Sequence, residues 1–443
     1  MPAPLPRDRI VLAIRNARVA TMNAAQAGAG DEPLGILEDG VVLIGADGLI
    51  AYAGPASGEP AAQDGRSQDG RSQDGRWQDE SSRAAVTIDA GGALVTPGLV
   101  EPHTHLLFGG DRAGEHAQRL AGASYLDLAK AGGGILSTVR ATRAASDEAL
   151  VAAALARVER LARAGVTTVE VKSGYGLSVA HELRLLRLIG AVAAQAPCDV
   201  IPTLLGLHAL PPELSREAWV RAVVEELTPE AARQGLARGC DAFCEQSAFT
   251  PAECRAALEA GVRAGLVPHL HADQLTAGGG AELAADLACA SADHLERTTS
   301  DGIAALARAG TSAVLLPLAA WFLRQDPARA LPFLAAGVPV ALGGNVNPGS
   351  QRIESVSMLL AAGCLLSGLT PAQALWACTR GGAQALRLDD RGRLEAGLRG
   401  DVVVWATRDA AHLPYHAGVE HALVVIRAGR IALDLRDAPP LHC

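Results

Sequence analysis

From residue 94 onward, short runs of buried-type residues alternate with stretches of helical period, and this alternation constrains the fold more than any other feature of the chain. It is the pattern of parallel β/α units. Eight strands are expected, at 94–105, 167–173, 199–208, 241–245, 266–271, 292–295, 312–316 and 339–342. Eight strands with helices between them predict an α/β fold, a (β/α)8 TIM-like barrel of ~250 residues with its active site at the C-terminal ends of the strands.

The segments between the strands carry helix signals of their own. Helices are expected at 147–164, 179–195 and 251–264. Ser146 stands directly before the first of these and Thr250 directly before the last, where residues that cap helix N-termini occur.

Both ends of the chain read as β-structure. Strand-like runs with turn signals lie at 11–14, 40–44, 49–52 and 86–89, and similar runs return at 401–405 and 423–426. We expect the two ends to combine into one small β-sandwich domain beside the barrel. This division gives a side domain from residues 1–93 and 391–443, and a barrel from 94–390.

A polar pentapeptide repeat interrupts the N-terminal part at about 63–80. Its units read Gln-Asp-Gly-Arg-Ser, Gln-Asp-Gly-Arg-Ser and Gln-Asp-Gly-Arg-Trp. Such units offer no apolar surface to bury. We expect a flexible surface loop without a role in the chemistry; a tag that binds a partner is the alternative.

Composition narrows the classes of function. Aromatic residues make up 3% of the 443 residues and the net charge is −9, whereas nucleic-acid surfaces use stacking aromatics and a basic excess. No apolar run reaches the ~18 residues of a membrane span, and the N-terminus lacks the features of a secretory signal. The eight cysteines form no Cys-x-x-Cys pair. We expect a cytoplasmic enzyme with buried thiols and no nucleic-acid or membrane partner.

Histidines gather at the expected strand ends. His103 and His105 are two residues apart, so the alternation of a strand puts both imidazoles on one face, about 6 to 7 Å apart along the chain. That arrangement suits two ligands of one metal ion. His208, His271 and His294 stand at later strand ends. Because four of eight expected strand ends carry histidine, the sequence predicts a metal-dependent active site at the mouth of the barrel.

The histidines lie within longer stretches that resemble the amidohydrolase superfamily. This match rests on Pro-Gly-Leu-Val-Glu-Pro-His-Thr-His at 97–105, on the later strand-end histidines and on Gly-Leu-Arg-Gly-Asp-Val-Val-Val at 397–404. Within the superfamily the sequence is similar to the imidazolonepropionase family. The narrower match uses stretches at 106–112, 132–140, 170–177, 207–209, 243–245, 271–274, 291–295 and 347–350.

The resemblance implies an activity and a cofactor. The expected reaction is hydrolysis of the ring amide C–N bond of 4-imidazolone-5-propanoate to N-formimidoyl-L-glutamate, in L-histidine degradation. It implies one zinc or iron ion per subunit, held by His103, His105, His271 and the residue at position 345. It also implies a homodimer.

The resemblance further implies a set of substrate contacts. They are Arg112, Tyr125, Tyr175, His208, Gln274, Asn347, Gly349 and Ser350. Physical chemistry supports several of these roles. The fork of Arg112 can grip the propanoate carboxylate, and the amides of Gly349 and Ser350 can point at an anion from a turn. His208 can donate to the carbonyl oxygen or transfer a proton.

Position 345 departs from the family pattern. The family has Asp there, whereas this chain has Asn345, which keeps a carbonyl oxygen but loses the charge and cannot act as a base. Gln274 is neutral as well, where some relatives carry Glu. The expected catalytic set is therefore His208, His294, Gln274 and Asn345, and the proton acceptors left in it are the two histidines, with Asp273 as a further candidate.

Two alternatives remain open. Asn345 could mark a catalytically impaired or inactive relative that only binds ligand. The chain could instead act on another ring as a different cyclic amidohydrolase or a deaminase, although Arg112, Tyr175 and the stretch 347–350 argue against that. For Lys172 we expect a salt bridge to Glu170 or its neighbours and no part in catalysis.

Overall fold

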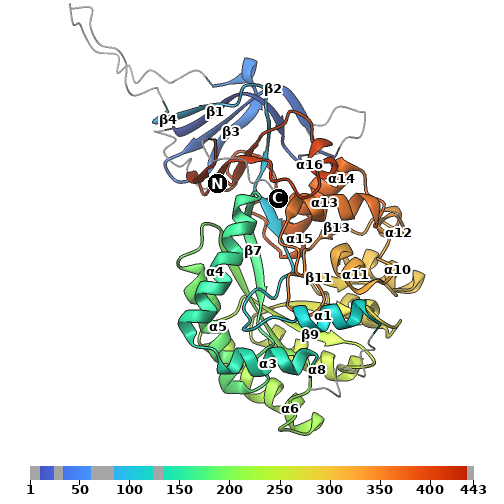
Figure 1. Cartoon of the computed structure of the whole chain (residues 1–443). Coiled ribbons are helices and arrows are strands. Elements are labelled where there is room, and N and C mark those ends of the chain that lie inside the picture. The colour runs from blue at the N-terminus through green and yellow to red at the C-terminus, as the bar shows by residue number, and fades with distance from the viewer. Residues whose placement is uncertain (1–9, 24–32, 61–83, 123–132, 437–443) are drawn as a thin grey trace, which may run out of the picture.

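The fold is described by a computed structural model that covers residues 10–23, 33–60, 84–122 and 133–436. Tyr125 and the pentapeptide repeat lie outside these residues. Figure 1 shows two parts, a sheet built from both ends of the chain and a larger body of strands and helices from its middle.

The larger body is the expected parallel barrel. Its strands pair in chain order, each parallel to the next. They are β6 (Leu99–Glu101), β7 (Val166–Lys172), β8 (Asp199–Leu207), β9 (Gly239–Cys244), β10 (Val267–Ala272), β11 (Ser291–His294), β12 (Ser312–Leu315) and β13 (Val340–Leu342). Most of their side chains are buried, as in a sheet covered on both faces.

Helices cover the outside of the strands (Figure 1). Three were expected and are confirmed as α4 (Asp147–Arg163), α5 (Val179–Ala193) and α8 (Pro251–Arg263). Ser146 caps α4 by accepting from the amide of Ala149 at 3.2 Å, and Thr250 forms a full capping box with Glu253. The other α-helices are α1 (Ala113–Leu120), α3 (Ile135–Ala144), α6 (Arg216–Ala222), α7 (Thr228–Arg233), α9 (Gly280–Asp286), α10 (Ser300–Ala309), α11 (Pro317–Leu323), α12 (Ala330–Ala335), α13 (Val356–Leu365), α14 (Pro371–Trp376), α15 (Gly382–Ala385) and α16 (His412–Tyr415).

The terminal sheet is mostly antiparallel and joins both ends of the chain. Its order is β16-β15-β14-β5-β1-β2-β3, with β4 also paired to β1. These strands are β1 (Ile10–Ala20), β2 (Ile36–Gly45), β3 (Ile50–Pro55), β4 (Val86–Asp89), β5 (Leu94–Pro97), β14 (Val402–Trp405), β15 (Ala422–Arg427) and β16 (Arg430–Asp434). One apolar cluster unites Ile14, Val42, Val402 and Val424, so the sheet has a core of its own. Across the described residues, no helix is both long and apolar enough to cross a membrane.

One expected strand is wrong as a single element. The stretch 94–105 forms two strands that belong to different sheets, since β5 pairs with β1 and β14 while β6 pairs with β7. The break falls at Gly98. A side chain there would place its Cβ only 2.0 Å from Oγ1 of Thr167, so the close approach of the chain to β7 requires glycine. His103 and His105 follow β6 in an extended loop.

That loop helps to close the barrel. His105 donates its backbone N–H to the carbonyl of Val346 at 3.0 Å, and Asn345 donates to the carbonyl of His103 at 2.9 Å. The segment after β6 is therefore joined to the segment after β13 at the C-terminal ends of the strands.

Candidate active site

Carboxylates fix the backbone that carries the first two histidines. Glu101 accepts from the amide of His103 at 3.1 Å and from the amide of Gly344 at 2.9 Å. Glu170 accepts from the amide of Thr104 at 3.2 Å. The side chains of both glutamates are buried, so the loop is held at fixed points from β6, β7 and the end of β13.

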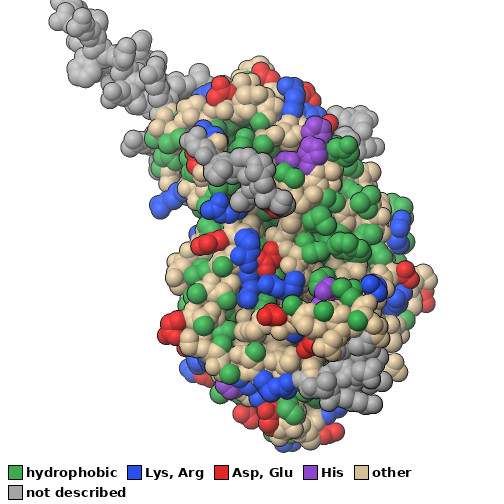
Figure 2. All heavy atoms as spheres, viewed as in Figure 1, with side chains coloured by type: hydrophobic (Ala, Val, Ile, Leu, Met, Phe, Trp, Pro, Cys, Tyr) green, Lys and Arg blue, Asp and Glu red, His purple; other side chains and the backbone are tan. Residues whose placement is uncertain are grey.

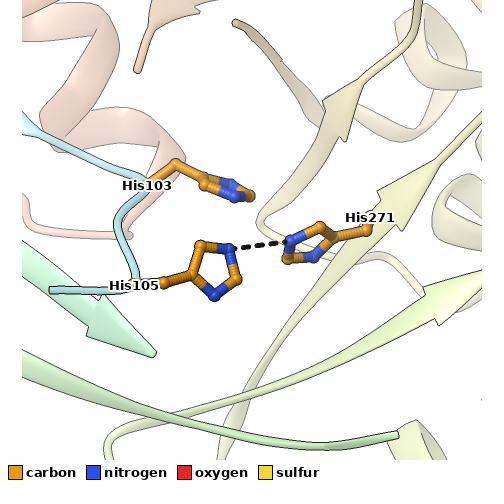
Figure 3. A group of neighbouring side chains, drawn as sticks. All are labelled: His103, His105 and His271. Atoms are coloured by element: carbon orange, nitrogen blue, oxygen red, sulfur yellow. Dashed lines mark hydrogen bonds between the residues drawn. The ribbon is translucent and has the colours of Figure 1, made fainter. Parts of the chain in front are cut away.

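His103, His105 and His271 converge at the end of the barrel (Figure 3). A nitrogen from each ring lies within 4.8 Å of the others, and all three side chains are buried. Among the described residues, only this group of histidine, cysteine or carboxylate side chains is close enough to hold a metal ion, and it contains no carboxylate. The three residues expected as metal ligands are thus brought together.

The donor set fits a metal ion. Nε2 of His105 lies 3.4 Å from Nε2 of His271. Two nitrogens at 2.0–2.1 Å from a tetrahedral ion are about 3.3–3.4 Å apart, so this separation matches one edge of such a site. Nε2 of His103 is buried without a hydrogen-bond partner. A cation between the rings would satisfy all three nitrogens.

The three rings are neutral when no ion is bound. Burial and the nearby positive groups hold the pKa of His103 and of His105 well below the ordinary histidine value. Burial lowers the pKa of His271 to about 4, even though the carboxylate of Asp241 opposes that shift. Neutral imidazole is the form that binds metal, because its ring nitrogen then has a free lone pair.

Two aspartates that the sequence reasoning missed face the outer nitrogens of these rings. Asp293 lies 2.6 Å from Nδ1 of His103, and Asp241 lies 2.9 Å from Nδ1 of His271. The contact of His103 with Asp293 is a hydrogen bond of the kind that sets the tautomer of a metal-binding histidine, whereas that of His271 with Asp241 is close but not aligned as a hydrogen bond. Asp293 lies inside the matched stretch 291–295, so the sequence contained a signal for it. Asp241 has no local feature that predicts its contact with His271, 30 residues away.

Lys172 sits between the carboxylates. It forms the expected ion pair with Glu170, at 2.9 Å, and a second one with Asp241, also at 2.9 Å. Burial alone would lower the pKa of Lys172, but Asp241, Glu170 and Asp293 together raise it above its usual range. The ammonium is therefore charged.

His208 and Tyr175 lie beside the metal ligands. The ring of His208 stacks on that of His105 with centroids 5.1 Å apart, and Tyr175 is 5.3 Å from His208. Nδ1 of His208 is 2.9 Å from the carbonyl oxygen of Gly174, which can only accept, so Nδ1 carries the proton. Burial lowers the pKa of His208 to about 4. Its Nε2 therefore has a free lone pair in this tautomer.

Arg112 lies against the loop after β13. Glu115 binds its Nε and Nη2, both at 2.8 Å, which fixes the plane of the guanidinium. A Cβ on Gly349 would be 2.2 Å from Nη1 of Arg112, so the two residues are in close contact. Arg119, which the sequence reasoning missed, donates to the carbonyl of Gly349 at 2.9 Å. Two guanidinium groups thus flank this loop.

One expectation about this loop needs correction. The amides of Gly349 and Ser350 do not point at an open anion site, because both donate to Oδ1 of Asn347 at 2.8 Å. An asparagine side chain that binds the backbone two or three residues ahead forms an Asx turn. In this conformation the Asx turn already occupies both donors.

Asn345 is buried next to the metal ligands but already has partners. Its side-chain oxygen accepts from Nδ2 of Asn347 at 3.1 Å, and its backbone donates to His103. Its φ of 51° lies in the left-handed region, which Asn and Asp tolerate better than other residues.

His294 stands beside the three rings with a carboxylate behind it. Its centroid is 5.4 Å from that of His271 and 5.7 Å from that of His103. Its Nδ1 is 3.5 Å from Oε1 of Glu296, a buried residue that the sequence reasoning missed. The φ of His294 is 82°, a strained value for a residue with a side chain, and such strain concentrates at functional sites.

Gln274 lies on a loop that two carboxylates fix through hydrogen bonds. Glu245 accepts from the amides of Leu275 and Thr276 at 2.8 and 3.3 Å. The carboxylate of Asp273 accepts four hydrogen bonds, from the amides of residues 278, 280 and 281 and from the hydroxyl of Thr298. Asp273 is therefore committed to the loop and is a poor candidate for a base.

Comparison with known proteins places this geometry in a family. A family model described as the amidohydrolase family matches residues 94–432. The imidazolonepropionase of Myxococcus xanthus strain DK1622 is 47% identical over 430 residues, which cover 96% of this chain and 98% of the relative. The chain belongs to the amidohydrolases and, among them, to the imidazolonepropionase family. The imidazolonepropionase of Anaeromyxobacter dehalogenans strain 2CP-1 is 53% identical over 366 residues, 81% of this chain and 86% of the relative.

Solved structures agree on the architecture. A zinc-bound adenosine deaminase from Xanthomonas campestris has a TM-score of 0.69 at 20% identity, and covers 99% of this chain and 96% of its own. A zinc complex of an atrazine chlorohydrolase from Arthrobacter aurescens has a TM-score of 0.71 at 17% identity, over 98% of this chain and 97% of its own. These confirm the amidohydrolase fold. With its family and its histidine cluster, the chain is a hydrolase of a metal-dependent family.

Proposed function

We propose that this chain hydrolyses the ring amide C–N bond of 4-imidazolone-5-propanoate to N-formimidoyl-L-glutamate, in L-histidine degradation. The convergence of His103, His105 and His271, with one nitrogen of each ring within 4.8 Å of the others, carries the proposal. The family of the relatives favours this reaction over another cyclic amidohydrolase, a deaminase or an inactive relative.

We propose zinc or iron as the ion, one per subunit, held by His103, His105 and His271 with the side-chain oxygen of Asn345 as a weak fourth ligand. Three imidazoles suit either metal. A divalent ion there supplies Lewis acidity that makes water more acidic near neutral pH. The outer contacts of His103 and His271 with Asp293 and Asp241 keep the inner nitrogens free for it.

Arg112 is our candidate for the carboxylate of the substrate. Glu115 holds its guanidinium in place, and Nη1 faces Gly349 on the loop after β13. A bidentate or end-on contact to the propanoate would orient the ring toward the histidines. Arg119 adds positive charge beside the same loop. Tyr175 and Asn347 complete the proposed pocket, with Ser350 and Gln274 at its rim.

We assign the proton transfer of this reaction to histidine. Water adds to the ring amide carbon, the C–N bond breaks, and the proton taken from water goes to the leaving nitrogen. His294 is placed for this transfer, because Glu296 faces its Nδ1 and stabilises the charged ring. His208 offers a lone pair at Nε2 from the other side of His105. Neither Asn345 nor Gln274 can accept the proton.

A substrate comparison tests the assignment. Purified protein is given 4-imidazolone-5-propanoate and, separately, the imidazolone with a methyl group in place of the propanoate, and loss of imidazolone absorbance is followed. We expect the full substrate to be preferred by about 10²-fold in kcat/KM, and Arg112→Gln to abolish that preference, because a charged hydrogen bond is then lost. Equal rates on both compounds by the native chain would contradict the proposed substrate.

We also propose a homodimer that uses an apolar face. Trp321, Leu331, Leu365 and Tyr415 are between 52 and 81% exposed, and α13 packs against α11 and α16 in this region. Figure 2 shows hydrophobic side chains gathering over this side of the molecule. Exposed apolar patches of this kind mark interfaces. Sedimentation of the wild type should give a dimer and Leu365→Glu a monomer; a monomeric wild type would contradict the proposal.

We propose that the protein works in the cytoplasm. The seven described cysteines are unpaired and most are buried, which suits a reducing compartment. Cell fractionation would test this, and recovery with an oxidising compartment would contradict it.

A further inference from the structure

The chain almost never uses lysine. Its 39 basic residues include only two lysines, Lys130 and Lys172, and the other 37 are arginine. Lys172 is nevertheless placed at the centre of the barrel, where its side chain is 1% exposed. A compact ammonium with three donors therefore suits this position in a chain that otherwise relies on guanidinium groups.

Lys172 lies beside carboxylates from three strands, β7, β9 and β11. Its Nζ lies 2.9 Å from Glu170, 2.9 Å from Asp241 and 3.8 Å from Asp293. We call these four residues the Lys172 cluster. Each carboxylate has a second contact. Asp241 faces Nδ1 of His271, Asp293 faces Nδ1 of His103, and Glu170 accepts from the amide between the first two histidines.

The charges of the cluster do not balance. Three buried carboxylates surround one ammonium, and burial, with Asp241 and Glu170 nearby, raises the pKa of Asp293 to about 8. Without the ammonium, buried carboxylates would take up protons or move toward solvent, because desolvation penalises unpaired charge. Lys172 therefore keeps Asp241 and Asp293 in position.

A carboxylate behind a histidine strengthens the metal bond that the ring makes. It fixes the proton on the outer nitrogen and raises the basicity of the inner one. In this chain the direct ligand position is neutral, because Asn345 stands there. Asp241 and Asp293 are the carboxylates that lie directly behind two of the metal-binding rings.

We propose that Lys172 is a positioning residue for the metal centre: its cluster holds Asp241 and Asp293 behind His271 and His103, at a centre where Asn345 supplies no charge. This inference rests on the metal centre of the proposed function and not on the identity of the substrate. Zinc binding measured without substrate therefore tests it separately from the reaction.

The test is a competition experiment on the full chain. Metal-free protein and a chromophoric zinc chelator share added zinc, and the chelator reports the affinity. Asp293→Asn keeps an oxygen to accept from Nδ1 of His103 but removes the charge. We expect Asp293→Asn and Lys172→Met each to weaken zinc binding by about 10–100-fold, the usual cost of losing such a contact. Asn345→Ala, which removes a neutral ligand, should cost less than either.

Asp199→Asn is the matched control. Asp199 is also a partly buried carboxylate among cations, with Arg391, Arg399 and Arg427 at 2.6–2.8 Å. It begins β8, at the end of the barrel opposite the histidines. We expect this variant to unfold at a lower temperature but to bind zinc within about twofold of wild type, since it touches no histidine of the site.

The outcomes separate the two claims. Weaker zinc binding in the two cluster variants but not in Asp199→Asn supports the proposal. If Lys172→Met does not fold, Asp293→Asn and Lys172→Arg provide the test. Asp293→Asn removes one of the three carboxylates and Lys172→Arg keeps the positive charge, so both leave the charge of the cluster better balanced. The larger guanidinium of Lys172→Arg should displace the aspartates. Unchanged zinc affinity in folded cluster variants overturns the proposal alone. A wild type that binds no zinc or iron overturns it together with the metal centre.

Discussion

Asn347 donates its side-chain amide to both oxygens of Asn345, at 2.7 Å to the carbonyl and 3.1 Å to Oδ1. This pair fixes the orientation of Asn345, which follows the eighth strand of the barrel. The donor would serve a carboxylate equally well, and the left-handed backbone of residue 345 tolerates Asp as it does Asn. The site is therefore built to accept either side chain.

Asn345→Asp should tighten the metal centre. The new carboxylate keeps the hydrogen bond from Asn347 and adds a charge next to the histidines, so the variant should fold as well as wild type. We expect at least about tenfold tighter zinc binding and a rate increase of about tenfold or more, within the range that an added base gives. Chelator competition and turnover measure the two effects. Slower turnover with tighter binding would show that the neutral residue is needed.

Gly349→Ala should impair substrate binding more than catalysis. Its Cβ would collide with Nη1 of Arg112, which must then leave its place. We expect KM to rise by about tenfold with kcat changed little, because Arg112 is remote from the reacting bond. Gly114→Ala, on α1 with open space around its Cβ, is the control and should leave KM unchanged. An unaltered KM in Gly349→Ala would remove Arg112 from the carboxylate site.

Glu296→Gln should slow the proton transfer. The substitution keeps the size of the side chain but removes the charge that faces Nδ1 of His294. We expect kcat to fall by about tenfold or more, while zinc affinity stays as in wild type, because His294 is not one of the three clustered ligands. If kcat does not change, His208 carries the proton instead, and His208→Asn should then remove the activity.

Acid should destabilise the metal-free protein partly through His269. Burial lowers the pKa of His269 to about 3, and Ser291 lies 3.0 Å from its Nδ1. In the unfolded chain this histidine takes up a proton below about pH 6.5, so its contribution to stability is present above that pH and is lost as pH falls toward 3. Between about pH 7 and about pH 5, wild type should lose about 2 kcal/mol more stability than His269→Gln. Denaturant unfolding at both pH values measures this; equal losses would contradict the assigned shift.

The barrel could be predicted because its signals are local. Strand-length apolar runs, the caps at Ser146 and Thr250 and the histidines at strand ends can each be read within a few residues. The structure confirms these elements, with bounds that differ by a few residues. The prediction of a single strand at 94–105 was wrong because a switch between two sheets leaves no local mark in the sequence except Gly98. The need for glycine at that position depends on the contact with Thr167.

The residues that support the metal ligands could not be predicted, because their contacts join residues that are far apart in the sequence. Asp293 and His103 are 190 residues apart, and the contact exists only once the barrel has closed. Lys172 was correctly paired with Glu170, its neighbour on one strand face, but its contacts with Asp241 and Asp293 need three neighbouring strands. The Asx turn at Asn347 is local, but a turn sequence of this kind suits a bound anion as well as an asparagine side chain, and here the side chain takes the donors.

Metal-dependent ring opening by the unaltered chain is the most direct test of the proposed hydrolysis. Metal-free protein is titrated with zinc or with ferrous iron, and loss of 4-imidazolone-5-propanoate is followed at each step. We expect no turnover without metal and a rate that rises until one ion is bound per subunit, with His105→Ala inactive throughout. Turnover by the metal-free protein, or none by the fully loaded wild type, would contradict the proposed hydrolysis.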